Sequence, residues 1–162
     1  QIGLCAGIQP LIGYNYGAKN SQRLKKVFFF TGMCAVLMGT GLTVLMVIAR
    51  AAVIRAFIND AQVIEYGIKM VIALQISGPV IGILFLCINT IQGMGKALPS
   101  LVLTICRQGV VFIPLVFILN SLFQLHGVIY AQATADFISN VLSVVICMGI
   151  IRKMERERSG EK

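Results

Sequence analysis

Two charged side chains lie inside apolar segments of this sequence, where an isolated charge is costly. Of the six acidic residues, Asp136 is the one that falls well within a predicted membrane-spanning stretch, and Arg107 is the one base well inside another. A carboxylate in hydrocarbon is a functional candidate, because it needs a partner or a wet cavity to stay charged. We predict that the two residues pair. The pair is either static, fixing two helices together, or it titrates or exchanges partners as the protein changes state.

The depths of these two residues in the membrane support the pairing. Arg107 follows Leu98 by nine residues, about 14 Å at 1.5 Å per residue, and Asp136 follows Gly127 by nine residues. If the two segments are antiparallel neighbours, each crossing about 30 Å of hydrocarbon, both charges come to nearly one level. Depth therefore favours an ion pair over two separate buried charges.

Uncharged polar residues follow one face of two apolar segments, 66–92 and 127–151. In each segment polar or small residues recur at spacings of three and four, which places them on a single helical face. Such a face turns away from lipid, toward a wet cavity or toward hydrogen bonds with neighbouring helices. The predicted cavity-lining or packing residues are Gln75, Asn89, Gln132 and Asn140.

The elements that must position these residues follow from hydropathy. Fifty-seven per cent of the 162 residues are hydrophobic and 12% are charged, and the mean hydropathy is +0.88, more than a soluble core requires. We predict an all-α membrane protein, a transmembrane helix bundle over residues 1–151 followed by a charged tail, 152–162. Each full span needs about 20 apolar residues. The predicted helices, the first of them partial, cover about 1–15, 27–49, 66–92, 98–120 and 127–151.

Basic residues gather at one predicted membrane face. The connection after the first segment carries Lys19, Arg23, Lys25 and Lys26, whereas the connection at 121–126 carries neither Lys nor Arg. Because cytoplasmic loops are rich in these residues, we predict a multi-pass protein of the bacterial inner membrane with a cytoplasmic C-terminus. Orientation explains the formal charge of +8, and no nucleic-acid partner is expected, since aromatic residues are hardly interleaved with the bases.

The tail, RKMERERSGEK, alternates in charge and has little to bury. It is either a solvated helix end that frays or a segment with a regulatory or lipid-binding role. Lipid is an expected partner of the bundle in either case.

Proline and glycine predict where the helices bend. Pro79 follows Gly78 in the middle of segment 66–92, where the missing N–H frees a carbonyl one turn earlier, so we predict a hinge at this pair. Pro114 predicts a second kink. Pro99 opens its helix, where a missing N–H costs nothing.

No cofactor or metal site is predicted. The five cysteines stand singly within apolar stretches, without a CxxC pair or a nearby His, which is typical of small packing residues. Clustered acids or a nucleophile beside a base, which an enzyme would need, are not visible either. The five cysteines are Cys5, Cys34, Cys87, Cys106 and Cys147.

One stretch carries a resemblance to a known family. The sequence GIQPLIGYNYGAKNSQRLKK, residues 7–26, closely resembles the multidrug and toxic compound extrusion (MATE) carriers, at a helix that reaches the cytoplasm before a basic loop. Two later stretches, 89–119 and 127–148, agree in order and spacing. The residues of this motif are Gln9, Pro10, Gly13, Tyr14, Asn15, Tyr16, Gly17, Ala18 and Asn20.

The resemblance implies a twelve-helix transporter made of two six-helix lobes. The five predicted helices then match the last five, so we expect a C-terminal fragment whose N-terminal lobe is missing, as the start inside an apolar stretch without Met also indicates. The Tyr-rich GYNYGA form resembles the MepA-like branch. That branch implies export of small cationic, amphipathic drugs in exchange for H⁺ or Na⁺.

One departure from the family affects the coupling ion. Some members carry a carboxylate of a cation site on the helix that matches 66–92, but residues 66–93 contain no Asp or Glu. A coupled cation would then bind in the missing lobe or at Asp136. Three alternatives stay open: a lipid-linked oligosaccharide flippase of the same superfamily, a membrane-embedded enzyme and a structural subunit.

Overall fold

The fold is helical throughout the part of the chain that can be described. The computed structural model describes residues 1–57 and 61–159, without the side chains of 55–57, 61–63, 65, 66, 69, 122–126, 128, 129 and 157–159. The predicted all-α class is confirmed. In chain order the helices are α1 (Ile2–Gly7), α2 (Gln9–Gly17), α3 (Ser21–Phe57), α4 (Ala61–Ile76), α5 (Gly78–Gly93), α6 (Ala97–Ile105), the π-helix η1 (Cys106–Val111) and α7 (Phe112–Ser159).

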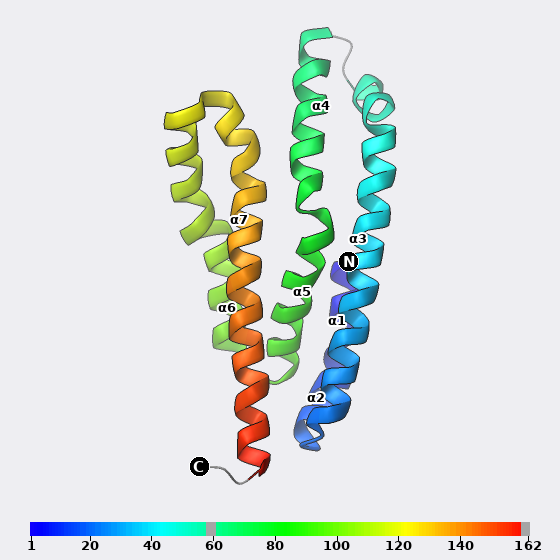
Figure 1. Ribbon diagram of the computed structural model, residues 1–162, viewed down its shortest axis with the longest axis vertical. Coiled ribbons are helices and arrows are strands. Elements are labelled where there is room, and N and C mark those ends of the chain that lie inside the picture. Colours follow the sequence, from blue (N-terminus) through cyan, green and yellow to red (C-terminus); the bar gives the residue numbers. More distant parts are fainter. Residues whose placement is uncertain (58–60, 160–162) are drawn as a thin grey trace.

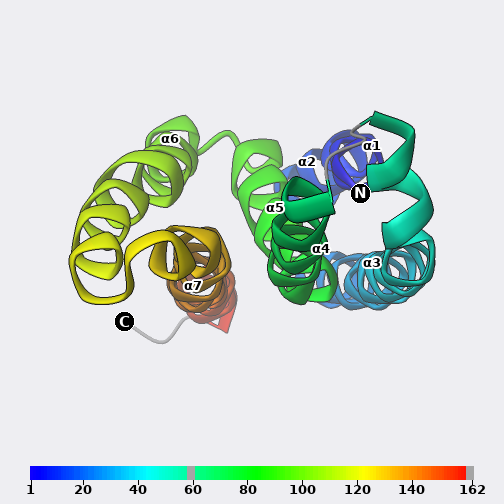
Figure 2. The ribbon, with the colours of Figure 1, turned by 90° about the horizontal axis from the view of Figure 1, so that it is seen from above.

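Helix α5 is the centre of the bundle. It packs against α3 on one side and against α7 on the other, and Figure 2 shows α6 and α7 on the opposite side of α5 from α1 and α3. The lower part of α5 is almost wholly buried because it has neighbours on both sides. Its buried residues are Gly82, Leu84, Leu86, Cys87, Ile88, Asn89, Thr90 and Ile91.

The described residues contain three to four helices able to cross a membrane. Ser21–Ile54, Ala97–Ser121 and Tyr130–Arg156 are long and apolar enough on their own. Met70–Ile76 and Gly78–Gly93 pass together as one span that is bent by 46°. Helices α1 and α2, which break at Ile8, correspond to the partial segment predicted at 1–15.

The predicted gap between segments 98–120 and 127–151 takes an unexpected form. The backbone stays helical from Phe112 to Ser159, yet the ribbon in Figure 1 turns back sharply within α7, at its yellow part. Gly127 lies at this reversal, and a Cβ there would meet the backbone carbonyl of Leu119. The reversal therefore depends on close backbone approach and not on an extended loop.

The backbone of segment 98–120 contains a π-helix that the sequence does not predict. The sequence predicts a kink at Pro114, which is the third residue of α7, and the π-helix ends three residues before it, at Val111. Because η1 continues into α7 within the span Ala97–Ser121, Pro114 lies inside a continuous helical stretch, where it leaves the carbonyl of Val110 without its usual N–H donor.

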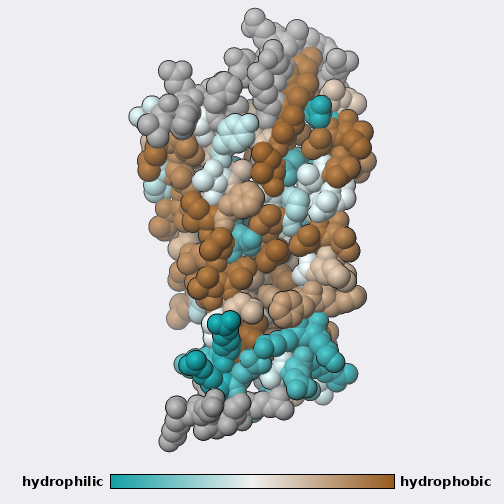
Figure 3. Space-filling model, in the orientation of Figure 1, coloured by the Kyte–Doolittle hydropathy of each residue, from teal (hydrophilic) through white to brown (hydrophobic). Residues whose placement is uncertain are grey.

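The surface of the bundle is that of a protein surrounded by lipid. Large apolar side chains such as Leu37, Ile48, Phe117 and Val141 are more than half exposed. Figure 3 shows a broad hydrophobic belt above a hydrophilic band. The band lies at the end of the bundle where α2 joins α3 and where α7 ends (Figure 1), and Lys25 in α3 bonds Glu155 in α7 there, Nζ to Oε1, at 2.7 Å.

Candidate functional site

Arg107 and Asp136 form an ion pair inside the bundle. The distance from Arg107 Nε to Asp136 Oδ1 is 2.9 Å, and the two side chains are 12% and 4% exposed. Gln132, one helical turn before Asp136, donates a hydrogen bond from Nε2 to the same oxygen at 3.3 Å. Within the described part of the chain, Oδ2 of Asp136 accepts no hydrogen bond. One carboxylate oxygen is therefore held by two side chains, one from η1 and one from α7.

The π-helix η1 presents Arg107 to this pair. Arg107 is the second residue of η1, whose wider turn changes the direction in which the following side chains point. Single π-helical turns inside longer helices are frequent at functional sites. The sequence CRQGVV contains no proline and nothing that predicts a π-helix, so this element was not anticipated.

Phe85 of α5 lies beneath the guanidinium of Arg107. The Cζ atom of Arg107 is 5.2 Å from the centroid of the Phe85 ring, within the range of a cation–π contact. Arg107 is therefore held between a carboxylate on α7 and an aromatic ring on α5. Three helical elements meet at this one cation.

The bend between α4 and α5 has a specific hydrogen-bond replacement. Pro79 has no N–H for the carbonyl of Gln75, one turn earlier. The hydroxyl of Thr43, on α3, donates to that oxygen over 3.5 Å. A Cβ added to Gly78 would meet Oγ1 of Thr43. The Gly78–Pro79 pair thus brings α3 close to the bend and leaves a carbonyl that the Thr43 hydroxyl can reach.

A cavity of about 440 Å³ opens at this bend, between α1, α3, α4 and α5. Its polar lining comes from Gln1, Thr43 and Gln75, and Gln1 donates from Nε2 to the carbonyl of Gly78 at 3.2 Å. Phe85 forms part of the apolar wall. Gln75 lines this cavity, and Phe85, which lines it too, also contacts the guanidinium of Arg107 in the buried ion pair.

Asn89 has a packing role. Its Oδ1 accepts a hydrogen bond from Gln9 Nε2 at 2.7 Å, its Nδ2 donates to the carbonyl of Phe85 at 2.8 Å, and Gln9 also donates to Gln92 Oε1 at 3.0 Å. These bonds join α2 to α5. Asn140 lies on α7, where its Oδ1 is buried without a described partner.

The predicted family motif forms α2 and its junction with α3. Asn15 is buried and donates to the carbonyl of Leu11 at 2.7 Å, while Asn20 Oδ1 accepts from the backbone N–H of Arg23 at 3.1 Å and caps α3. A Cβ at Gly13 would stand 2.9 Å from the carbonyl oxygen of Gly93. Pro10 opens α2, Tyr16 packs on the core, and Tyr14, Gly17 and Ala18 are exposed.

These features define a multi-pass membrane protein with a bent span beside a polar cavity. The MatE family pattern matches residues 1–118 of the 162. The chain therefore belongs to the MATE family of transporters, which confirms the predicted resemblance and the prediction that it is not an enzyme.

Several curated relatives carry the name multidrug export protein MepA. The one from Staphylococcus saprophyticus is 30% identical over 145 residues, covering 90% of this chain and 32% of the relative. That from Staphylococcus haemolyticus is 27% identical over 158 residues, covering 98% and 34%. The chain thus spans about a third of the length of the relatives it matches, as a fragment would.

Solved MATE structures share the fold. The MATE multidrug transporter DinF-BH, solved in complex with a drug-like ligand, is 34% identical, with a TM-score of 0.81 over 89% of this chain and 32% of that one. An outward-facing MATE transporter is 17% identical, with a TM-score of 0.86 over 93% and 35%, and supports the fold alone. The described helices of this chain therefore match about a third of a MATE transporter structure.

Proposed function

We propose that this chain forms part of a cation-coupled antiporter that exports small cationic, amphipathic compounds by alternating access. The observation that carries the proposal is the bent span α4–α5 with a polar cavity at the bend. Broken helices beside a cavity near the middle of the membrane are a recurring feature of transporters, because the freed backbone groups line the substrate path.

The names of the relatives support the substrate class. The MepA relatives are named for multidrug export, and DinF-BH was solved with a drug-like ligand bound. The described residues that line the cavity at the bend carry no charged side chain. A diphosphate head, as a flippase would carry, calls for bidentate bases such as arginine. An amphipathic cation therefore suits this wall better than a lipid-linked oligosaccharide does.

Ion coupling is assigned to Asp136, with Arg107 as its partner. Oδ1 is bound to Arg107 and Gln132, and Oδ2 is open to H⁺ or Na⁺. Binding of a cation would weaken the attraction to Arg107, whose guanidinium also rests on Phe85. Phe85 lines the cavity, so a change at the pair would reach the cavity wall.

The basic end of the bundle supports an orientation with the C-terminus in the cytoplasm. The Lys25–Glu155 pair joins the start of α3 to the end of α7. With this end toward the cytoplasm of a bacterial cell, both the basic connection and the tail satisfy the positive-inside tendency. Substrate would then leave through the opposite end.

Dye efflux tests the proposal. The full-length product of the gene is expressed in a bacterium that lacks its own pumps, and ethidium efflux is followed before and after the proton and sodium gradients are collapsed in turn. Efflux that stops with one gradient supports the antiporter and identifies the ion. Absence of efflux for every cationic dye contradicts it and favours the flippase.

A further inference from the structure

An apolar groove in the bundle ends near a cluster of bases. The groove, of about 310 Å³, lies between α3, α5 and α7 and is lined only by apolar side chains and a glycine. Its length from Phe29 to Val36 is roughly 10 Å at 1.5 Å per residue. The lining residues are Phe28, Phe29, Gly32, Val36, Ile83, Leu86, Val144 and Met148.

Gly32 gives the groove its depth. Gly32 has no side chain, and a Cβ at this position would stand 3.3 Å from Leu86 Cδ2. The backbone of α3 therefore approaches Leu86 of α5 closely at the floor of the groove. Phe29 on α3 and Met148 on α7 form the walls toward the hydrophilic end. The result is a channel for a flexible apolar chain and not a flat helix surface.

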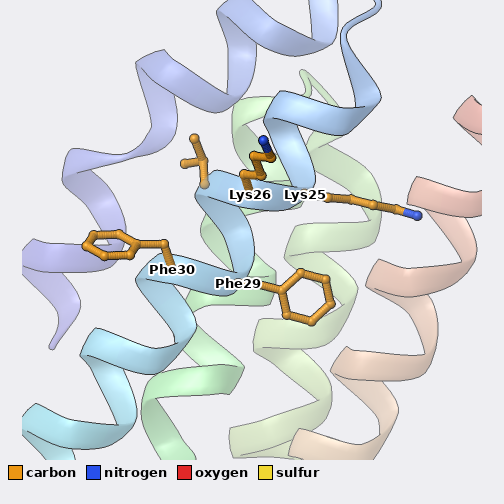
Figure 4. A pocket seen from close by; sticks show the side chains of 5 residues that line it. Lys25, Lys26, Phe29 and Phe30 are labelled. Atoms are coloured by element: carbon orange, nitrogen blue, oxygen red, sulfur yellow. The ribbon is translucent and has the colours of Figure 1, made fainter.

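The bases lie one helical turn beyond these walls. Lys25 precedes Phe29 by four residues, and Arg152 follows Met148 by four, so each base shares the helical face of the groove residue above it. Figure 4 shows Lys25 and Phe29 projecting on the same side of α3, with Phe30 on the other. Bases therefore stand where the apolar groove reaches the hydrophilic band.

Several bases described at this end have no ion-pair partner among the described residues. Glu155 pairs with Lys25, but no carboxylate among the described residues pairs with Arg152, Lys153 or Arg156. These three line a hollow of about 480 Å³ together with Gly149. Lys25 and Lys26 also line a second hollow, together with Val27, Phe29 and Phe30 (Figure 4).

We infer that this groove binds an anionic phospholipid. One acyl chain lies between Phe29, Val144 and Met148, and the phosphate lies beside Arg152, next to the Lys25–Glu155 pair. Basic residues next to an apolar groove at a membrane face are suited to anionic head groups, which attract each nearby base by about 1 kcal/mol. A free phosphate shares the head-group chemistry but leaves the apolar groove empty.

Lipid competition on the purified full-length protein tests this site. The delipidated protein is incubated with phosphatidylglycerol and phosphatidylcholine of identical acyl chains, and the bound lipids are counted by native mass spectrometry. We expect phosphatidylglycerol to be preferred. Arg152→Gln should lower that preference roughly fivefold, the effect of one base at a membrane surface, whereas Lys96→Gln, in the connection from α5 to α6, should leave it unchanged.

A second pair of variants tests the groove. Val144→Phe fills the groove and should reduce retention of both lipids severalfold, while Val102→Phe, on the exposed face of α6, should not. Equal lipid preference in Arg152→Gln and the unsubstituted protein would overturn the inference. Displacement of the lipid by an equal concentration of glycerol phosphate would overturn it too, because a phosphate alone would then suffice.

Discussion

Phe85 lies between the cavity and the buried ion pair, with its ring 5.2 Å from Cζ of Arg107. The same ring forms part of the cavity wall at the bend between α4 and α5. The predictions below follow from this arrangement and from the bend beside it.

Asp136→Asn should abolish the response of efflux to external pH. The substitution keeps the size of the side chain but removes its negative charge and the oxygen that can take up a proton. Efflux is measured over a pH series in cells and in vesicles. Glu155→Gln is the matched control, because Glu155 lies in the surface pair with Lys25. A pH response that survives in Asp136→Asn would show that the pair is static.

Arg107→Met should destabilise the protein by about 3–5 kcal/mol, because it leaves the Asp136 carboxylate buried without a counter-charge. Adding Asp136→Leu should recover part of that loss, since the second substitution removes the orphaned charge. Thermal unfolding in detergent is the measurement. Lys25→Met, which breaks the exposed pair, should cost no more than about 1 kcal/mol. Equal losses of stability in Arg107→Met and Lys25→Met would contradict the expectation that the buried pair matters more than the exposed one.

Pro79→Ala should slow efflux without loss of stability. Alanine restores an N–H that can bond the carbonyl of Gln75, so the bend of 46° loses its cause. Pro99→Ala is the control, because the missing N–H of Pro99 falls in the first turn of α6. Efflux and unfolding temperature are measured on both. Full efflux in Pro79→Ala would exclude a hinge at Gly78–Pro79.

Gly13→Ala and Gly17→Ala test whether the glycines of the family motif are needed for the close contact between α2 and α5. An added Cβ at Gly13 meets the Gly93 carbonyl oxygen at 2.9 Å, whereas at Gly17 nothing lies within 4 Å. We expect Gly13→Ala to destabilise the protein by about 1–3 kcal/mol, as overpacking does. Gly17→Ala should be nearly neutral in thermal unfolding. Similar effects at both positions would mean that the motif matters for something other than the contact between α2 and α5.

The ion pair could be predicted from the sequence because a charged side chain in hydrocarbon needs either an opposite charge or a wet cavity. Asp136 needed a partner, and Arg107 was the one base at a matching depth. The aromatic contact could not be predicted, since Phe85 is one of nine phenylalanines and an aromatic residue in an apolar helix has many packing options. The contact of Phe85 with Arg107 depends on the direction in which η1 points the Arg107 side chain.

The backbone was predictable in outline and not in detail. Apolar run length gave the segments, and the Gly78–Pro79 pair indicated the bend that the structure has. The π-helix and the helical reversal at Gly127 depend on contacts between segments, which hydropathy does not encode. Asn89 shows the same limit, because polarity on a helix face does not decide between a cavity and the hydrogen bond with Gln9.

The two halves of the bent span, α4 and α5, differ in burial, and this difference indicates which half can move at the bend. Below Ser77, α5 is enclosed by α3 and α7; above it, Met70, Leu74 and Ile76 of α4 are each more than 40% exposed. Helix α4 also packs against α3 and α7, but less extensively than α5 does, so a rotation at Ser77 would break fewer contacts if α4 moved than if α5 did. If the bend changes during transport, we therefore expect the sixteen residues of α4 to move against a fixed α5.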